Sequence, residues 1–187
     1  MSRQINFPNK KYNIIYADPP WKFSSAKYQD GNRGFGNRVE NFYPTMTCKE
    51  ICNLPIENIA DKDCILFLWT TDSHLLEALE VMKSWNFNYK TIGFTWVKKY
   101  NTGAYCYNFG AYTLKSTEIC LIGLKGKLKN LKKSNNVKGL VFAERTKHSK
   151  KPNEIRKRIV DLCGDISRIE LFARQRVEGW DVWGNEV

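Results

Sequence analysis

Short apolar runs rich in β-branched and aromatic residues recur along the chain, and they constrain its fold more than any other feature. We expect them to form strands at residues 12–17, 64–69, 91–97, 119–124, 140–143 and 169–172, with a further candidate at 180–183. Because these runs are nearly continuous in apolar residues, the sheet should be covered on both faces. Helical patterns lie between the strands, which favours an α/β fold with crossover connections.

Two segments between the expected strands have helical spacing. The first should begin after a cap at Thr71 or Asp72, and its apolar face should contain Leu75, Leu76, Leu79 and Met82. The second has Pro152 in its first turn and Gly164 at its end, an arrangement typical of helix boundaries. Its buried side is expected to contain Ile155, Ile159, Val160 and Cys163.

Length and composition indicate one domain over residues 1–187, since 187 residues with 42% hydrophobic content support a single core. The composition excludes a disordered or collagen-like chain. No apolar run approaches the roughly 20 residues that a membrane span needs, and the first residues resemble neither a secretory signal nor a transit peptide. We therefore expect a cytoplasmic protein.

Cysteine and histidine usage gives no metal-binding pattern. The six cysteines are scattered, and Cys64, Cys120 and Cys163 lie in apolar runs where a thiol acts as a small hydrophobe. Cys48 and Cys52 are four residues apart, but no second pair follows at zinc-ligand spacing. We expect neither a disulfide framework nor a metal site.

The excess positive charge is concentrated in one window, residues 125–158. This window holds thirteen Lys and Arg against two acids, and the net charge of the whole chain is +11. Such clustering indicates a polyanionic partner, although a solubilising surface is the alternative. The residues expected to contact nucleic acid are Lys129, Lys132, Lys133, Lys147 and Lys150.

The segment 22–44 is long, polar and rich in glycine. A loop of this length inside a compact domain is usually a functional lid or disordered. It directly follows Asp18, Pro19, Pro20 and Trp21, which stand at the end of the first expected strand, where ligands bind in open α/β sheets. We therefore expect residues 22–44 to form an active-site lid.

The Asp-Pro-Pro-Trp segment suits the binding of an exocyclic amine. Prolines donate no N–H, so the Asp18 carboxylate and the Pro19 carbonyl are expected to be free acceptors for two amine hydrogens. That arrangement would direct the nitrogen lone pair at an electrophile. The Trp21 ring could stack on a base, as could Phe23, Phe35 and Tyr43 in the lid, although each of these rings could equally pack in the core.

A series of motifs in order along residues 12–186 resembles the family of the eukaryotic messenger-RNA adenine-N6 methyltransferase catalytic subunit, including its bacterial and phage members. The motifs are Asp18-Pro19-Pro20-Trp21, Tyr43-Pro44-Thr45-Met46, Thr95-Trp96-Val97-Lys98, Glu118-Ile119-Cys120, Lys150-Lys151-Pro152, Glu170-Leu171-Phe172 and Trp183-Gly184-Asn185-Glu186. The resemblance implies a Rossmann-like methyltransferase fold in circularly permuted order, with the catalytic strand first and the cofactor strand near the C-terminus.

The resemblance also implies the cofactor and the roles of individual residues. S-adenosylmethionine would be the methyl donor, and Asp18, Pro19, Pro20 and Trp21 would hold the target amine beside it. Lys151 would face the methionine carboxylate. Arg174, Asn185 and Glu186 would contact the ribose and adenine, although messenger-RNA enzymes often have glutamine in place of Glu186.

The expected reaction is methyl transfer to the N6 amine of adenine in DNA, since small basic members of the family resemble the bacterial and phage forms. The same reaction on RNA is the alternative, because phosphate contacts carry no base information. A non-catalytic nucleic-acid-binding subunit is a second alternative, which the intact Asp18 opposes. A homodimer or a related partner subunit is expected, because little chain lies outside the catalytic domain.

Overall fold

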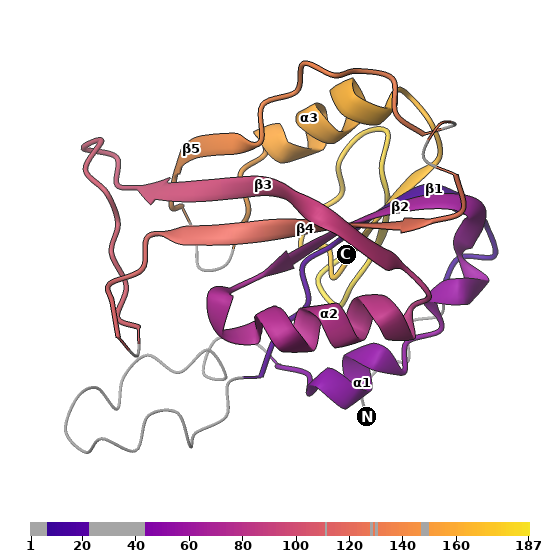
Figure 1. Cartoon of the computed structure of the whole chain (residues 1–187), viewed down its shortest axis with the longest axis horizontal. Helices are drawn as coiled ribbons and strands as arrows, with labels where there is room; N and C mark the ends of the chain where they lie inside the picture. Colours follow the sequence, from indigo (N-terminus) through magenta and orange to yellow (C-terminus); the bar gives the residue numbers. More distant parts are fainter. Residues whose placement is uncertain (1–6, 23–43, 111, 128, 130, 147–149) are drawn as a thin grey trace.

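The computed structural model describes residues 7–22, 44–110, 112–127, 129, 131–146 and 150–187 (Figure 1). The elements in chain order are β1 (Tyr12–Ala17), α1 (Cys48–Cys52), η3 (Ile56–Asn58), β2 (Ala60–Thr70), η4 (Asp72–His74), α2 (Leu75–Ser84), β3 (Asn88–Lys99), β4 (Thr117–Lys125), β5 (Leu140–Glu144), α3 (Glu154–Cys163), β6 (Arg168–Leu171) and β7 (Asp181–Trp183). The seven expected strands are confirmed, and β2, β3 and β4 extend beyond the apolar runs that predicted them.

The strands form one mixed sheet in the order β5-β3-β4-β2-β1-β6-β7. The first strand of the chain lies inside the sheet, parallel to β2 on one side and to β6 on the other. The C-terminal strand β7 continues this parallel half, whereas β4 is antiparallel to both β2 and β3. A central first strand beside two C-terminal strands is the order expected for the permuted Rossmann-like fold.

Helices cover both faces of the sheet, as the apolar strands predicted. Figure 1 shows α1 and α2 on one face and α3 on the other. On the first face Ile51, Val81 and Trp85 pack in one buried cluster. On the other face Ile155 and Ile159 pack in a second cluster. Cys64, Cys120 and Cys163 are fully buried, as expected for thiols in apolar strands and helices.

The buried face of α2 agrees in part with the predicted one, since Met82 is buried and Leu79 packs against the core, whereas Leu75 and Leu76 do not. Leu76 is 79% exposed and Leu75 is 37% exposed, whereas Ala78, Val81 and Met82 are buried. The apolar stripe thus runs through residues 78, 81, 82 and 85, at helical i, i+3, i+4 and i+7 spacing. Leu75 and Leu76 stand in the first turn of α2, directly after η4, and lie outside this stripe. No helix in the described part of the chain is long and apolar enough to cross a membrane.

Candidate active site

The backbone after β1 is fixed by hydrogen bonds to the segment that precedes α1. The Met46 N–H donates to the Pro20 carbonyl at 2.8 Å, and the Lys22 N–H donates to the Met46 carbonyl at 3.0 Å. The Trp21 N–H donates to the Pro19 carbonyl at 2.9 Å. The sequence predicted a free Pro19 carbonyl, but this carbonyl already accepts one hydrogen bond. Its oxygen keeps a second lone pair. These hydrogen bonds hold the Asp-Pro-Pro-Trp loop in place at the carboxyl end of β1.

The Trp21 side chain is an internal part of this edge. Its ring lies 5.7 Å from the His74 imidazole at an interplanar angle of 21°, and its indole N–H donates to the Trp69 carbonyl at 3.1 Å. Only 7% of Trp21 is exposed. Of the two alternatives that the sequence left open for this ring, the burial favours packing in the core, and the role of Trp21 in stacking on a base stays a prediction. Phe23, Phe35 and Tyr43 lie outside the described residues.

Four charged side chains form a continuous chain beside the loop. The Lys151 ammonium lies 2.7 Å from both carboxylate oxygens of Asp18. It also lies 3.1 Å from Glu118, which in turn accepts a hydrogen bond from Lys98. The side chain of Asp18 is 23% exposed and that of Lys151 is 9% exposed, so the pairing is largely shielded from water.

The topology explains why these residues meet. Asp18 follows the last residue of β1, and Lys98 is close to the last residue of β3. Glu118 lies near the first residue of β4. Because β4 is antiparallel to β2 and β3, the beginning of β4 lies at the same end of the sheet as the carboxyl ends of β1, β2 and β3. Lys151 precedes α3. Neither Glu118 nor Lys98 had a predicted role, although both stand inside motifs that carry the family resemblance.

Burial and charge act on the pKa values in opposite senses. Burial raises the pKa of Asp18 above its usual range, and the Lys151 ammonium partly offsets that rise. Glu118 is also buried, but Lys151 and Lys98 outweigh this, so its pKa is lowered. Burial opposes the charge on Lys151, yet Asp18 and Glu118 raise its pKa above its ordinary value. The ammonium and the two carboxylates therefore stabilise one another's charged forms against the cost of burial.

The other residues expected to bind the cofactor lie at the ends of β6 and β7. The Arg174 Nε lies 3.6 Å from the Glu186 carboxylate, so the structure brings these two predicted residues together. Asn185 is exposed next to Glu186. Gly184 permits a close approach of the two strand ends, because a Cβ there would lie 2.4 Å from the Ala173 carbonyl oxygen. Arg174 also acts electrostatically on Asp18, lowering its pKa.

Comparison with known proteins places this arrangement in a family. The MT-A70 family model matches residues 12–186. The chain belongs to the MT-A70 family. It is 38% identical over 191 residues to the type II methyltransferase M.MunI of Mycoplasma sp, an alignment that covers 96% of this chain and 79% of M.MunI. It is 29% identical to human N(6)-adenine-specific methyltransferase METTL4 and 28% identical to the N(6)-adenosine-methyltransferase MT-A70-like protein of Drosophila melanogaster. It spans only 39% and 27% of those two proteins.

The residues at this edge of the MT-A70 domain suit S-adenosylmethionine. That molecule carries a carboxylate, an ammonium, a sulfonium and a ribose diol, so it needs both cations and carboxylates around it. The edge offers both kinds of group, cations at Lys151 and Arg174 and carboxylates at Asp18 and Glu186. No phosphate-binding glycine loop is required, since this molecule has no phosphate.

The basic window does not form one surface. The backbone N–H of Lys127 donates to Asp63, near the beginning of β2, and that of Lys133 donates to the Leu162 carbonyl. This part of the window therefore lies at the other end of the strands from Asp18. The exposed residues Lys129, Lys132 and Lys133 belong to this distant part. Lys150 is half-buried next to Lys151 at the near edge, and Lys147 lies outside the described residues. The lid expected at residues 22–44 also lies almost entirely outside them.

An aromatic hairpin at the near edge was missed by the sequence analysis. Residues 100–116 join β3 to β4, and isolated bridges link Lys99 to Tyr105 and Asn108 to Lys115. Figure 1 shows this connection extending beyond the sheet. Its exposed aromatic residues in the described part of the chain are Tyr100, Tyr105, Tyr107, Phe109 and Tyr112, which are 47%, 48%, 55%, 83% and 99% exposed. The alternation of Tyr105, buried Cys106, Tyr107 and Phe109 is the signal that could have revealed one aromatic face.

Proposed function

We propose that this MT-A70 protein transfers a methyl group from S-adenosylmethionine to the N6 amine of adenine in DNA. The observation that carries the proposal is the Asp18 carboxylate, paired with Lys151 and held beside a hydrogen-bonded Pro-Pro turn at the end of β1. The 38% identity to a type II methyltransferase over 96% of the chain supports DNA as the substrate class.

Two acceptors at this site can orient an adenine amine. The Asp18 carboxylate accepts one amine hydrogen, and the remaining lone pair of the Pro19 carbonyl accepts the other. With both hydrogens engaged, the nitrogen lone pair is directed away from the loop, toward a bound electrophile. S-adenosylmethionine supplies that electrophilic methyl group when bound. Lys151 favours the ionised form of Asp18 against the effect of burial, and a protonated Asp18 would lose part of the acceptor capacity that the amine needs.

The cofactor would be held by residues at the carboxyl ends of the parallel strands. Lys151 directs its three N–H donors at the two Asp18 oxygens and at Glu118, so binding of the methionine carboxylate would take one of these donors from its present acceptor. Arg174 and Glu186 form a pair whose polar atoms can bind the ribose hydroxyls, and Asn185 beside them can bind the adenine edge. These assignments follow the family resemblance and agree with the placement of the four residues along one edge.

Nucleic acid would approach this edge through the aromatic hairpin. Unpaired bases stack on aromatic side chains, and Tyr105, Tyr107 and Phe109 are exposed next to the Asp18 site. The Lys99 ammonium lies 5.6 Å from the Tyr105 ring and 5.1 Å from the Phe142 ring, which places a cation among the aromatic rings. We propose a duplex whose target adenine is extruded toward Asp18.

RNA is the second candidate substrate, because two of the similar proteins are named for adenine-N6 and adenosine-N6 methylation in general. The Asp18 site would act identically on either polymer. A non-catalytic role is disfavoured by the intact Asp18 and its pairing with Lys151. We include in this proposal a second copy of the chain, or a related subunit, that completes the surface recognising the nucleic acid.

The test is direct methylation. Purified protein and S-adenosylmethionine are incubated with unmethylated genomic DNA in one reaction and with total RNA in another. Each nucleic acid is then digested to nucleosides, which are analysed by mass spectrometry. We expect N6-methyldeoxyadenosine from DNA. A gain on RNA alone would establish the second candidate, and no gain on either with cofactor binding intact would indicate a missing subunit.

Asp18→Ala should abolish this transfer and leave cofactor binding nearly intact. Asp72→Ala is the matched control, because Asp72 is an aspartate at the same edge that pairs with Lys115 on the surface. Equal loss of transfer in both variants, or loss of cofactor binding together with folding in Asp18→Ala, would contradict the role of Asp18.

A further inference from the structure

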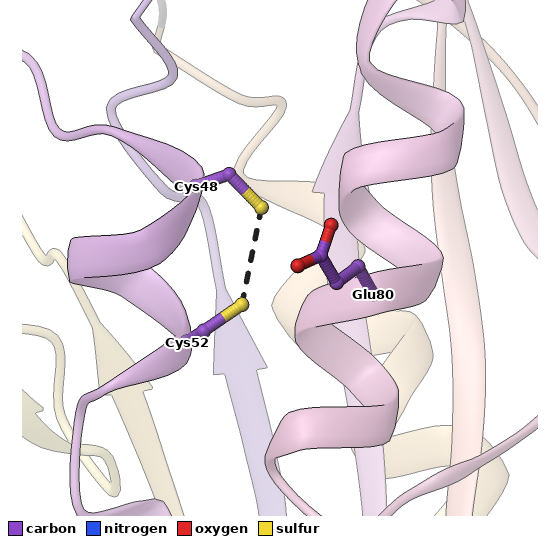
Figure 2. A group of neighbouring side chains, drawn as sticks. All are labelled: Cys48, Cys52 and Glu80. Carbon is purple, nitrogen blue, oxygen red and sulfur yellow. Dashed lines mark hydrogen bonds between the residues drawn. The ribbon is translucent and has the colours of Figure 1, made fainter.

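Three potential metal ligands converge on the face of the sheet that carries α1 and α2. Cys48 and Cys52 are one turn apart on α1, with their sulfur atoms 3.8 Å from each other. Figure 2 shows Glu80 on α2 directed at the same point. The two sulfur atoms and a carboxylate oxygen of Glu80 all lie within 4.8 Å of one another. The two cysteines are half-buried and Glu80 is exposed, so the cluster is open to solvent on one side.

We propose that Cys48, Cys52 and Glu80 bind a thiophilic divalent cation, with zinc the expected metal and water in the fourth position. Two thiolates bound to tetrahedral zinc at about 2.3 Å from the metal stand about 3.8 Å apart. The sulfur atoms already have this separation without any rearrangement of α1. The proposal does not depend on the methyltransferase function, because none of the three residues touches Asp18 or the residues paired with it.

A carboxylate as third ligand distinguishes this cluster from a pair of thiols that merely share a helix. A disulfide needs its sulfur atoms about 2.0 Å apart, whereas these sulfurs are 3.8 Å apart and the intervening helical turn fixes their spacing. A disulfide would also make no use of Glu80. Zinc accepts thiolate sulfur and carboxylate oxygen in one tetrahedral site, and the open side supplies the water.

The Cys48 side chain also has a hydrogen bond that a metal would replace. Its thiol donates to the Glu77 carbonyl at 3.8 Å. Zinc binds cysteine as the thiolate, so metal binding releases the thiol protons and breaks this hydrogen bond.

The bound cation would join α1 to α2 directly beneath the candidate active site. α1 follows Met46, whose backbone pairs with the Pro20 and Lys22 backbone on either side of Trp21. A pocket of about 250 Å³ separates the cluster from the loop, and its walls are formed by Trp21, Lys22, Thr47, Cys48, His74 and Glu77. The expected role of the cation is to fasten the helix that positions the Asp-Pro-Pro-Trp loop, so metal should raise the thermal stability of the whole chain.

Cobalt is the probe that reports the ligands directly. Full-length protein is reduced, stripped of metal with a chelator, exchanged into chelator-free buffer and titrated with Co²⁺, and then Zn²⁺ is added as competitor. We expect one equivalent of Co²⁺ to produce sulfur-to-cobalt charge-transfer bands with intense tetrahedral visible bands, and Zn²⁺ to abolish them. Zn²⁺ should also raise the melting temperature.

Variants assign the ligands. Cys48→Ser and Cys52→Ser should each lose part of the charge-transfer intensity, the double variant should lose all of it, and Glu80→Gln should shift the visible bands and weaken binding. Cys163→Ala and Glu57→Gln are the controls, since that cysteine is buried in α3 and that glutamate is exposed away from the cluster. Both should titrate like the wild type.

The proposal is overturned if Co²⁺ produces no charge-transfer bands, or if the bands survive in the double cysteine variant. It is equally overturned if mass spectrometry of the reduced, metal-free protein shows a rapidly re-formed Cys48–Cys52 disulfide that Zn²⁺ does not prevent. The melting temperature of each metal-free variant is compared with that of metal-free wild type, so a folding defect is recognised as such and not read as a missing ligand.

Discussion

Lys151→Met should raise the pKa of Asp18 by removing the cation that stabilises its charged form. The Lys151 ammonium lies 2.7 Å from each carboxylate oxygen of Asp18, and both side chains are mostly shielded from water. Burial already raises the pKa of Asp18, and Lys151 is the strongest of the groups that oppose this rise. Methionine has a similar length but neither charge nor N–H donors, so the substitution removes the charge and its hydrogen bonds while keeping most of the side-chain volume.

The magnitude follows from the surroundings that remain. An adjacent cation lowers a carboxyl pKa by about 1–3 pH units, which corresponds to about 1–4 kcal/mol. After the substitution Glu118 still raises the pKa of Asp18, and Arg174 lowers it from further away. We therefore expect the pKa of Asp18 to rise by about 1–3 units. In the methylation assay the acid limb of the pH profile should move to higher pH, because activity needs the ionised carboxylate.

The assay is a ¹³C NMR titration of carboxyl-labelled aspartate in the cofactor-free protein, with the Asp18 signal assigned by its absence in Asp18→Asn. Measuring without cofactor separates the effect on Asp18 from any effect of Lys151 on cofactor binding. Lys150→Met is the matched control and should leave the Asp18 titration unchanged. An Asp18 pKa that is unaltered or lower in Lys151→Met would refute the reasoning.

Three further predictions concern stability and nucleic-acid binding. Arg156→Met should lower the free energy of unfolding by about 3–5 kcal/mol, because Glu170 loses a two-fold 2.7 Å pairing inside the core; the double variant Arg156→Met/Glu170→Leu should regain most of this in urea unfolding, and equal loss in both would contradict it. Gly126→Ala should destabilise more than Gly103→Ala, because both have positive φ but only at Gly126 would the new Cβ meet backbone, 2.2 Å from the Lys62 carbonyl oxygen; equal melting temperatures would contradict it. Reversing Lys129, Lys132 and Lys133 to glutamate should flatten the salt dependence of DNA binding by about 0.9 in slope for each phosphate that the protein no longer neutralises; an unchanged slope would make this distant basic surface a solubilising one.

Much of the fold could be predicted because its signals are local. A β-branched run that stops at two prolines predicts a buried strand with a loop at its end, and β1 with Asp18 is the outcome. The same holds for α3, where Pro152 and Gly164 bound the helix. The face of α2 was right for Leu79 and Met82 and wrong for Leu75 and Leu76, because leucines at both positions of a first helical turn do not show which of its sides the sheet will cover.

The candidate site was predicted only in part because its decisive contacts join distant segments. Asp18 and Lys151 are separated by 133 residues, and only the resemblance of the motifs connected them before the structure did. Glu118 reaches them because β4 runs antiparallel to β2, and strand direction cannot be read from an apolar run. Glu80 joins Cys48 and Cys52 for a similar reason, since the packing of α2 on α1 is a tertiary fact.

The charges at the site indicate that different residues bind the target amine and the phosphates of the nucleic acid. Asp18 and Glu118 balance Lys98 and Lys151, so this buried chain of side chains carries no net charge. A neutral adenine amine can enter it without disturbing that balance, whereas a phosphate would have to break one of its pairs. Cations outside this chain must therefore bind the phosphates. Substitutions within the chain should lower kcat, and substitutions in the exposed basic residues should act through KM and its dependence on salt.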